Sequence, residues 1–310
     1  MTVPLRPARH AVDRHYVLVT PTHFAVEHAI NPWMDPAVDV DRHRALRQWQ
    51  GLVATYRALG HSVTELPGVA GLPDMVFAAN GALAIDGRAV VASFAHPQRR
   101  PESAHFRRLL QSHLGLATVE AIDVNEAEGD MVVVGDVILA GTGFRTAVPA
   151  HHQVATEFTR EVVTLELHDP RFYHLDVAVA ALDDHTIAWY PAALAPEARR
   201  ALARRFPTAI ELDEHDAMVL GANLVSDGRH VVLDERATAL AAAVEEAGFV
   251  AVPVAVDEFN KSGGGVKCLT MEVHRSRRAT DRGTPGASVA WHANGSTATP
   301  TPTESRGAVA

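Results

Sequence analysis

Most of this 310-residue chain repeats one order of elements, a β-hairpin followed by a helix and a single strand. Hairpins are indicated where apolar runs flank the turns Asp86-Gly87, Gly135-Asp136 and Asp227-Gly228, because Asp-Gly between such runs favours a tight turn. The unit recurs at intervals of roughly 45 to 55 residues, a period typical of folds built from repeated units. The repeat therefore predicts a modular α/β fold.

Four copies of this unit are complete in the sequence. We expect hairpins over residues 75–94, 131–140, 175–190 and 223–233. We expect helices over residues 40–59, 101–114, 149–160, 196–205 and 236–248. The single strands are expected over residues 62–66, 118–124, 162–167, 209–212 and 250–256.

Two predicted strands near the ends of the repeat region lack a hairpin partner, one over residues 16–20 and one over 268–273. Pairing them would complete a fifth copy and remove exposed sheet edges. The alternative is an open α/β sheet, which would alternate single strands with helices. Because hairpins separate the helices here, we favour the closed ring.

Composition and charge exclude several classes of protein. The net charge of −9 lacks the basic excess expected of a nucleic-acid-binding surface, and no apolar run is long enough to span a membrane. The single cysteine cannot form an internal disulfide, and residues 1–14 lack the apolar core of a secretory signal. We therefore expect a cytoplasmic protein, with one catalytic domain over residues 15–274 and a disordered tail over 275–310.

Cys268, the only cysteine, follows three glycines and precedes an apolar, strand-like segment. Glycine lets the backbone approach another group closely, so this loop has the character of one that closes around a small molecule. A nucleophile and a buried structural cysteine both fit this position.

Polar residues recur where each predicted hairpin begins. These starts are residues 73–80, 125–130, 172–176, 221–223 and 264–268, and they contain acids, amides, a histidine and the cysteine. In a ring of modules, equivalent positions meet at one end. We therefore expect these five segments to share one site.

The residue types at these starts suit attack on a planar cation. Cysteine needs a nearby base or a cationic field to ionise, and His174 can exchange protons near neutral pH. Glu126 can orient the imidazole, and Asp176 lies two residues after His174, on the same face of the predicted strand. Asp176 and Asp74 can hold an amidine or guanidine, because carboxylates match a guanidinium in charge and shape.

On these motifs the sequence resembles the guanidino-group-modifying enzymes, or amidinotransferase superfamily, which include arginine deiminase, dimethylarginine dimethylaminohydrolase and glycine amidinotransferase. It is most similar to bacterial arginine dihydrolases. The matching segments are residues 30–34, 71–80, 140–146, 171–176 and 267–270. The resemblance implies an α/β fold of five ββαβ modules, a propeller with pseudo-fivefold symmetry.

The resemblance also implies roles for individual residues. Cys268 matches the nucleophile and His174 the general acid and base. Glu126 matches the orienting glutamate, although the surrounding motif differs and Glu128 remains an alternative. The implied substrate contacts are Asn31, Asp74, Phe77, Asn80, Arg99, Arg145, Asp176 and Ser262, with the two arginines binding a carboxylate.

The implied reaction forms a covalent thiouronium on Cys268, which water then hydrolyses to a ureido product. Arginine dihydrolase activity, ending at ornithine, ammonia and carbon dioxide, is the first expectation, because Asn80 stands where deiminases and dimethylargininases carry a carboxylate. An amide can donate a hydrogen bond to a neutral ureido group. Dimethylargininase and deiminase activities remain alternatives, as does a propeller that binds an amino acid without catalysis.

No cofactor or metal is expected, since the histidines show no ligand spacing. The expected partner is a small guanidino amino acid rather than a nucleic acid or a membrane. The sequence leaves homo-oligomerisation open.

Overall fold

The computed structural model describes residues 9–275, which lie in one compact unit. Apart from Arg275, the predicted tail falls outside the described residues. Within residues 9–275, no helix has the length and apolar character needed to cross a membrane.

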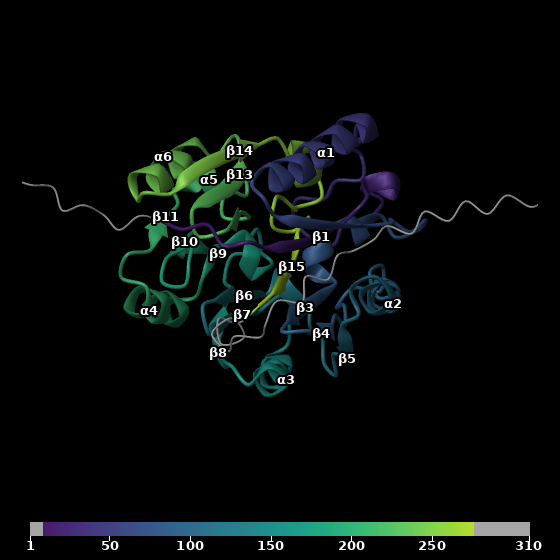
Figure 1. Cartoon of the computed structure of the whole chain (residues 1–310), viewed down its shortest axis with the longest axis horizontal. Helices are drawn as coiled ribbons and strands as arrows, with labels where there is room; N and C mark the ends of the chain where they lie inside the picture. The colour runs from purple at the N-terminus through teal and green to yellow at the C-terminus, as the bar shows by residue number, and fades with distance from the viewer. Residues whose placement is uncertain (1–8, 276–310) are drawn as a thin grey trace, which may run out of the picture. The chain divides into compact units, whose positions relative to one another are not determined.

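The described residues form a mixed α/β fold with four sheets (Figure 1). The first seven strands are β1 (His15–Val19), β2 (Ser62–Leu66), β3 (Ala82–Ile85), β4 (Arg88–Val91), β5 (Ala117–Glu120), β6 (Met131–Val134) and β7 (Val137–Thr142). The next eight are β8 (Glu161–Glu166), β9 (Val179–Ala181), β10 (Ile187–Trp189), β11 (Ile210–Glu211), β12 (Val225–Ser226), β13 (His230–Asp234), β14 (Val250–Val254) and β15 (Met271–His274).

The helices are α1 (Arg42–Ala58), α2 (Glu102–Leu114), α3 (Val148–Phe158), α4 (Pro196–Arg205), α5 (Glu214–Met218), α6 (Thr238–Glu246) and α7 (Asp257–Asn260). Short 3₁₀ turns are η1 (Pro21–His23), η2 (Pro73–Val76), η3 (Ala78–Asn80), η4 (Ala127–Gly129), η5 (Leu175–Val177) and η6 (Pro191–Ala193). The long helices agree with the predicted ones within about two residues, as expected for helix ends, whereas α5 and α7 were not predicted.

One pairing pattern recurs through the sheets. In β6–β7–β8, β9–β10–β11 and β12–β13–β14, the first pair of strands is antiparallel and the second is parallel. A helix connects the second strand of each sheet to the third, because parallel strands need a long crossover. In Figure 1 the helices α1, α2, α3, α4 and α6 lie outside the strands.

The fourth sheet contains the two strands that lacked partners in the sequence. Its strand order is β2-β1-β15-β3-β4-β5. β15 pairs antiparallel with β1, so the predicted pairing of these segments is confirmed. β15 also runs parallel to β3 through Val273 and His274, and this joins two copies of the pattern into six strands.

Three predicted strands begin at least three residues later than expected. The predicted hairpin over 75–94 starts within η2 and η3, and its first strand begins only at Ala82. The predicted hairpin over 175–190 starts with η5, and its first strand begins only at Val179. Cys268 lies in a turn, and β15 begins only at Met271. Backbone bonds such as Phe77 N–H to Asp74 O (3.0 Å) and Asn80 N–H to Phe77 O (3.1 Å) satisfy these residues locally. The residues are buried on all sides, so their apolar run does not distinguish a turn from a strand.

The largest apolar core lies between the sheets and helices. It includes Tyr16, Leu52, Tyr56 and Phe172, and it extends to Cys268. The cysteine therefore lies where the apolar core meets the polar turns.

We predict opposite effects on stability from two Gly→Ala substitutions. A Cβ at Gly81 would lie 2.4 Å from the Phe106 ring, which is buried, so G81A should lower the free energy of unfolding by about 1–3 kcal/mol. Gly51 lies inside α1, and a Cβ added there would have no neighbouring atom within 4 Å. G51A should raise the free energy of unfolding by about 0.5–1 kcal/mol. Urea unfolding followed by circular dichroism measures both, and equal midpoints would contradict the packing argument.

Candidate active site

A small pocket opens beside Cys268 and contains most of the predicted substrate contacts. It is lined by Ile30, Asn31, Met34, Asp74, Phe77, Asn80, Arg99, Arg145, Tyr173, Ser262 and Cys268. Of the eight predicted substrate contacts, only Asp176 does not line the pocket, and its carboxylate lies against the thiol instead.

Cys268 is held between an amide and a carboxylate. Its Sγ lies 3.2 Å from Asn223 Nδ2 and 3.3 Å from Asp176 Oδ2. Its backbone N–H donates to Asn223 Oδ1 at 3.0 Å. Asn223 therefore fixes both the backbone and the side chain of the cysteine.

Burial raises the pKa of the Cys268 thiol well above its ordinary value, and the Asp176 charge raises it further. Burial also raises the pKa of Asp176 to about 6. Asp176 Oδ1 is buried without a hydrogen-bond partner. Burial and the neighbouring Asp176 charge therefore both favour the protonated thiol over the thiolate.

Glu126, rather than Glu128, contacts the predicted acid–base residue. Glu126 Oε2 lies 2.8 Å from His174 Nε2 and 3.0 Å from Arg145 Nη1. Burial opposes ionisation of Glu126, but the hydrogen bond to His174 and the charge of Arg145 outweigh it and lower its pKa. His174 Nδ1 is buried without a partner, so this nitrogen is available to exchange a proton.

Glu128 belongs to a different group of charges. Its carboxylate lies 2.9 Å from Lys267 Nζ and 2.5 Å from His274 Nε2, and it accepts a bond from the Glu272 N–H at 2.9 Å. Glu128 therefore links the segment before Cys268 to β15.

His174 and Asp176 do not share the face of a strand, because η5 begins directly after His174. That part of the prediction was wrong. The turn is fixed by the buried Asp130 carboxylate, which accepts from the N–H groups of Leu175 and Thr146, each at 3.1 Å. The turn of η5, and not the face of a strand, brings the His174 imidazole near enough to the Asp176 carboxylate for the two to interact electrostatically.

The glycines before Cys268 fit against site residues. A Cβ on Gly263 would lie 2.9 Å from Asn31 Oδ1, and one on Gly264 would lie 2.2 Å from the Phe77 ring. Gly263 also has φ +80°, a conformation that favours glycine. The loop is therefore packed closely against the pocket wall, as its sequence indicated.

Both predicted carboxylate-binding arginines line the pocket and already have partners. Arg99 makes a paired contact with Glu102 at 3.0 and 2.9 Å, and it donates to Asn80 Oδ1 at 2.9 Å. Arg145 donates to the backbone oxygen of Ile30 at 2.8 Å in addition to its bond with Glu126. These contacts fix the guanidinium planes, and the oxygen of the Asn80 amide is occupied.

The segment between η1 and α1 supplies Ile30, Asn31 and Met34 to the pocket lining. Asn31 Nδ2 donates to the backbone oxygen of Ser262 at 3.1 Å, and Trp33 Nε1 donates to Arg171 O at 2.7 Å. Asn223, Tyr173, Ile30 and Met34 were not among the predicted site residues. Asn223 and Tyr173 do lie at predicted hairpin starts, and this position in the sequence could have identified them as site residues.

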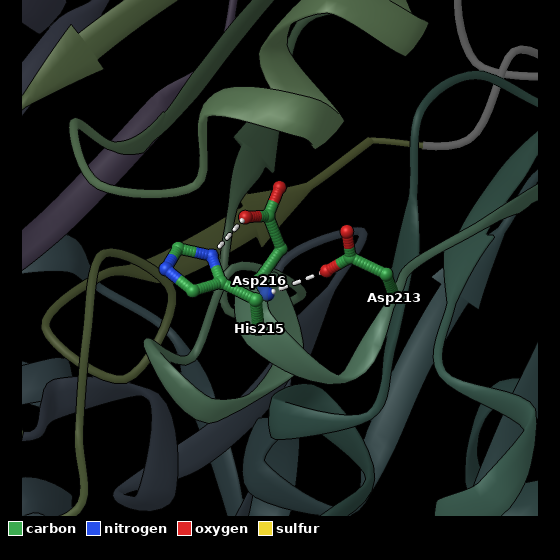
Figure 2. A group of neighbouring side chains, drawn as sticks. All are labelled: Asp213, His215 and Asp216. Atoms are coloured by element: carbon green, nitrogen blue, oxygen red, sulfur yellow. Dashed lines mark hydrogen bonds and ion pairs between the residues drawn. The ribbon is translucent and has the colours of Figure 1, made fainter.

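Asp213, His215 and Asp216 are the group within residues 9–275 whose possible metal-ligand atoms lie within 4.8 Å of one another. Figure 2 shows Asp213 bonded to the backbone N–H of Asp216, and His215 Nδ1 bonded to Asp216 Oδ1. The other Asp216 oxygen accepts from Leu240 N–H at 2.6 Å. Asp213 is the N-cap of α5, and Asp216 accepts from an N–H in the first turn of α6, so both carboxylates have structural partners.

The family model and a relative that covers most of the chain both point to dimethylarginine hydrolases. A family model described as N,N dimethylarginine dimethylhydrolase, eukaryotic, matches residues 18–275. The N(G),N(G)-dimethylarginine dimethylaminohydrolase of Mycobacterium tuberculosis is 48% identical over 269 residues, which cover 86% of this chain and 89% of the relative.

Arginine dihydrolases are also similar to this chain. The bifunctional arginine dihydrolase/ornithine cyclodeaminase AgrE of a Nostoc species is 31% identical, and the match covers 83% of this chain and 37% of AgrE. The substrate-bound N-terminal domain of ArgZ, an arginine dihydrolase from cyanobacteria, superposes with a TM-score of 0.81 at 30% identity. That match covers 85% of this chain and 99% of the domain.

We predict that the Cys268 thiol ionises only well above its ordinary pKa of 9.0 in the free protein. The chain has no other cysteine, so thiolate absorbance, measured as the parent minus Cys268→Ser, reports this group alone. Asp176→Asn removes the charge that raises the thiol pKa and should move the inflection downward by on the order of one pH unit. A parent inflection below pH 9, or no shift in D176N, would contradict this electrostatic description.

Proposed function

The chain belongs to the N,N-dimethylarginine dimethylhydrolase family, and we propose that it hydrolyses dimethylarginine to citrulline and dimethylamine. Hydrolysis of a C–N bond in a guanidino group is common to this family and to the similar dihydrolases. The first expectation, arginine dihydrolase activity, has weaker support. The relative at 48% identity is a dimethylargininase, whereas the dihydrolase AgrE shares 31%.

The observation that carries the proposal is the unpaired Asp176 oxygen beside a protonated thiol. A buried carboxylate oxygen without a partner is costly unless a donor binds it. A guanidinium supplies both N–H donors and positive charge. The Asp176 charge raises the pKa of the Cys268 thiol. A bound guanidinium offsets that charge, so it lowers the thiol pKa and favours the thiolate.

The reaction follows from these positions. When the cation binds, the Cys268 thiol gives its proton to His174, and the thiolate attacks the guanidinium carbon. His174 then donates that proton to dimethylamine as the C–N bond breaks. This leaves a thiouronium on Sγ. His174 then removes a proton from water, and the hydroxyl adds to the same carbon. The C–S bond breaks, the proton of the added hydroxyl passes to the Cys268 sulfur as the carbonyl forms, and citrulline is released. Glu126 orients the imidazole and stabilises its cationic form.

The rest of the pocket suits the amino acid end of the substrate. Arg99 and Arg145 provide positive charge for its carboxylate. Asp74, the acidic residue that lines the pocket, provides negative charge for its ammonium group. Both ends of an α-amino acid thus have a partner of opposite charge.

At the level of the fold, we propose a five-module ββαβ propeller with pseudo-fivefold symmetry that forms a catalytic domain over residues 15–274. The repeated antiparallel-then-parallel pairing supports five modules, the fifth being β15, β1, α1 and β2. A cytoplasmic location stays a prediction from the single cysteine.

Arginine dihydrolase activity remains the second candidate because of Asn80. Its Oδ1 is occupied by Arg99, which turns its Nδ2 donors toward other acceptors. The Nδ2 contact with Glu126 O is long, at 3.4 Å. A donor here suits the oxygen of a neutral ureido group, which a second round of hydrolysis must bind.

Product analysis on asymmetric dimethylarginine, arginine and citrulline separates these activities. We expect citrulline and dimethylamine from dimethylarginine, with citrulline then accumulating. Cys268→Ser should lose all turnover. Release of ornithine from arginine and consumption of citrulline would instead establish the dihydrolase. Equal inactivity of parent and C268S toward every guanidine would favour a binding protein without catalysis.

We predict that Glu126→Gln and Glu128→Gln affect different properties. E126Q removes the carboxylate that orients His174 and should lower kcat on the order of 100-fold. E128Q leaves that contact intact and should change kcat by less than about threefold, while lowering the unfolding midpoint because Lys267 loses its buried partner. Steady-state kinetics and urea unfolding of both variants measure this, and a larger kcat loss in E128Q would overturn the assignment.

A further inference from the structure

His28 is hydrogen-bonded to Asp74, a carboxylate that lines the pocket. It lies between η1 and α1, two residues before the pocket residue Ile30, and its Nε2 is 2.7 Å from Asp74 Oδ2. The other oxygen, Asp74 Oδ1, accepts from Ser262 Oγ at 3.3 Å. Both oxygens of Asp74 therefore have partners within the protein.

The two members of this pair differ in access to solvent. The side chain of Asp74 is 2% exposed, whereas that of His28 is 18% exposed. His28 can thus exchange a proton with solvent while Asp74 faces the pocket. The other charged or titratable groups that act on His28, or on which it acts, are Arg99, Glu27 and His96.

The hydrogen bond to Asp74 raises the pKa of His28, against the opposing effect of burial. When His28 is protonated, the pair is neutral, and Asp74 offers little net charge to a second cation. A protonated imidazole also repels a neighbouring ammonium group.

Resting on the proposed function, we propose that His28 competes with the substrate's α-ammonium group for Asp74, so that substrate binding releases a proton from His28. His28 is then a positioning residue that makes recognition of the amino group dependent on pH. It takes no part in the reaction at Cys268.

The sign of the pH dependence follows. Below the pKa of His28, binding must displace its proton, so affinity should rise by up to about tenfold per pH unit as pH increases. Above that pKa, the ring is neutral, the negative charge of Asp74 is no longer offset by His28, and the pH dependence contributed by His28 levels off. Asp176, whose pKa is raised to about 6 by burial, also makes binding depend on pH. A substitution at position 28 leaves the Asp176 contribution unchanged, so the difference between the two proteins reports His28.

Calorimetric binding to Cys268→Ser tests the proposal without turnover. Asymmetric dimethylarginine is titrated into C268S and into C268S/H28N at several pH values from 5.5 to 8. Each titration is repeated in two buffers of different ionisation enthalpy, because the difference in measured heat gives the number of protons released on binding. Asn at position 28 keeps a donor but does not titrate. We expect C268S/H28N to release fewer protons and to bind more tightly than C268S at pH 5.5.

The outcomes are distinct. Equal proton release and parallel pH curves in the two proteins overturn the role of His28 while leaving the proposed function intact. Absence of binding to C268S by dimethylarginine, arginine and citrulline overturns the proposed function, and with it this inference. If C268S/H28N fails to fold, C268S/H28Q takes its place. A guanidino acid without the α-amino group is the matched control ligand, and its pH curve should be the same with and without His28.

Discussion

The buried carboxylate of Glu126 is the interaction on which the arrangement of the site depends. It is fully buried, yet it receives donors from His174, Arg145 and the backbone N–H of Ala95, which come from three separate parts of the chain. A buried charge is tolerated only when hydrogen bonds and opposite charge replace its lost water. Loss of one partner therefore affects the others. Through Arg145 and Ile30 O, the same carboxylate also helps to hold the wall of the pocket.

The modular order of the fold was visible in the sequence because turns and helix ends have strong local signals. The Asp-Gly turns and the proline near the start of α4 locate elements through backbone geometry alone. The pairing of β1 with β15 followed from the need to cover two unpaired strands. The 3₁₀ turns were missed because segments such as residues 73–80 are buried on all sides. Secondary structure is predicted from the spacing of apolar and polar residues, and a mostly apolar run shows no such spacing.

The candidate site residues that could be predicted from the sequence are those that lie where a predicted hairpin begins. Cys268, His174 and Asp74 lie at hairpin starts, and the structure brings those starts together. Glu126 and Glu128 could not be separated in advance, because η4 turns them toward different partners. His28 lies in a segment without regular structure, where spacing says nothing about which side chain meets which.

The pairing of β1 with β15 also has a consequence for synthesis. β1 emerges from the ribosome early, but its antiparallel neighbour is made roughly 250 residues later. Until then, β1 has an open edge, and the site lacks its thiol because Cys268 comes just before β15. A nascent chain that ends before residue 268 therefore lacks the proposed nucleophile. That residue and the strand that covers the edge of β1 are made together, at the end of the described residues.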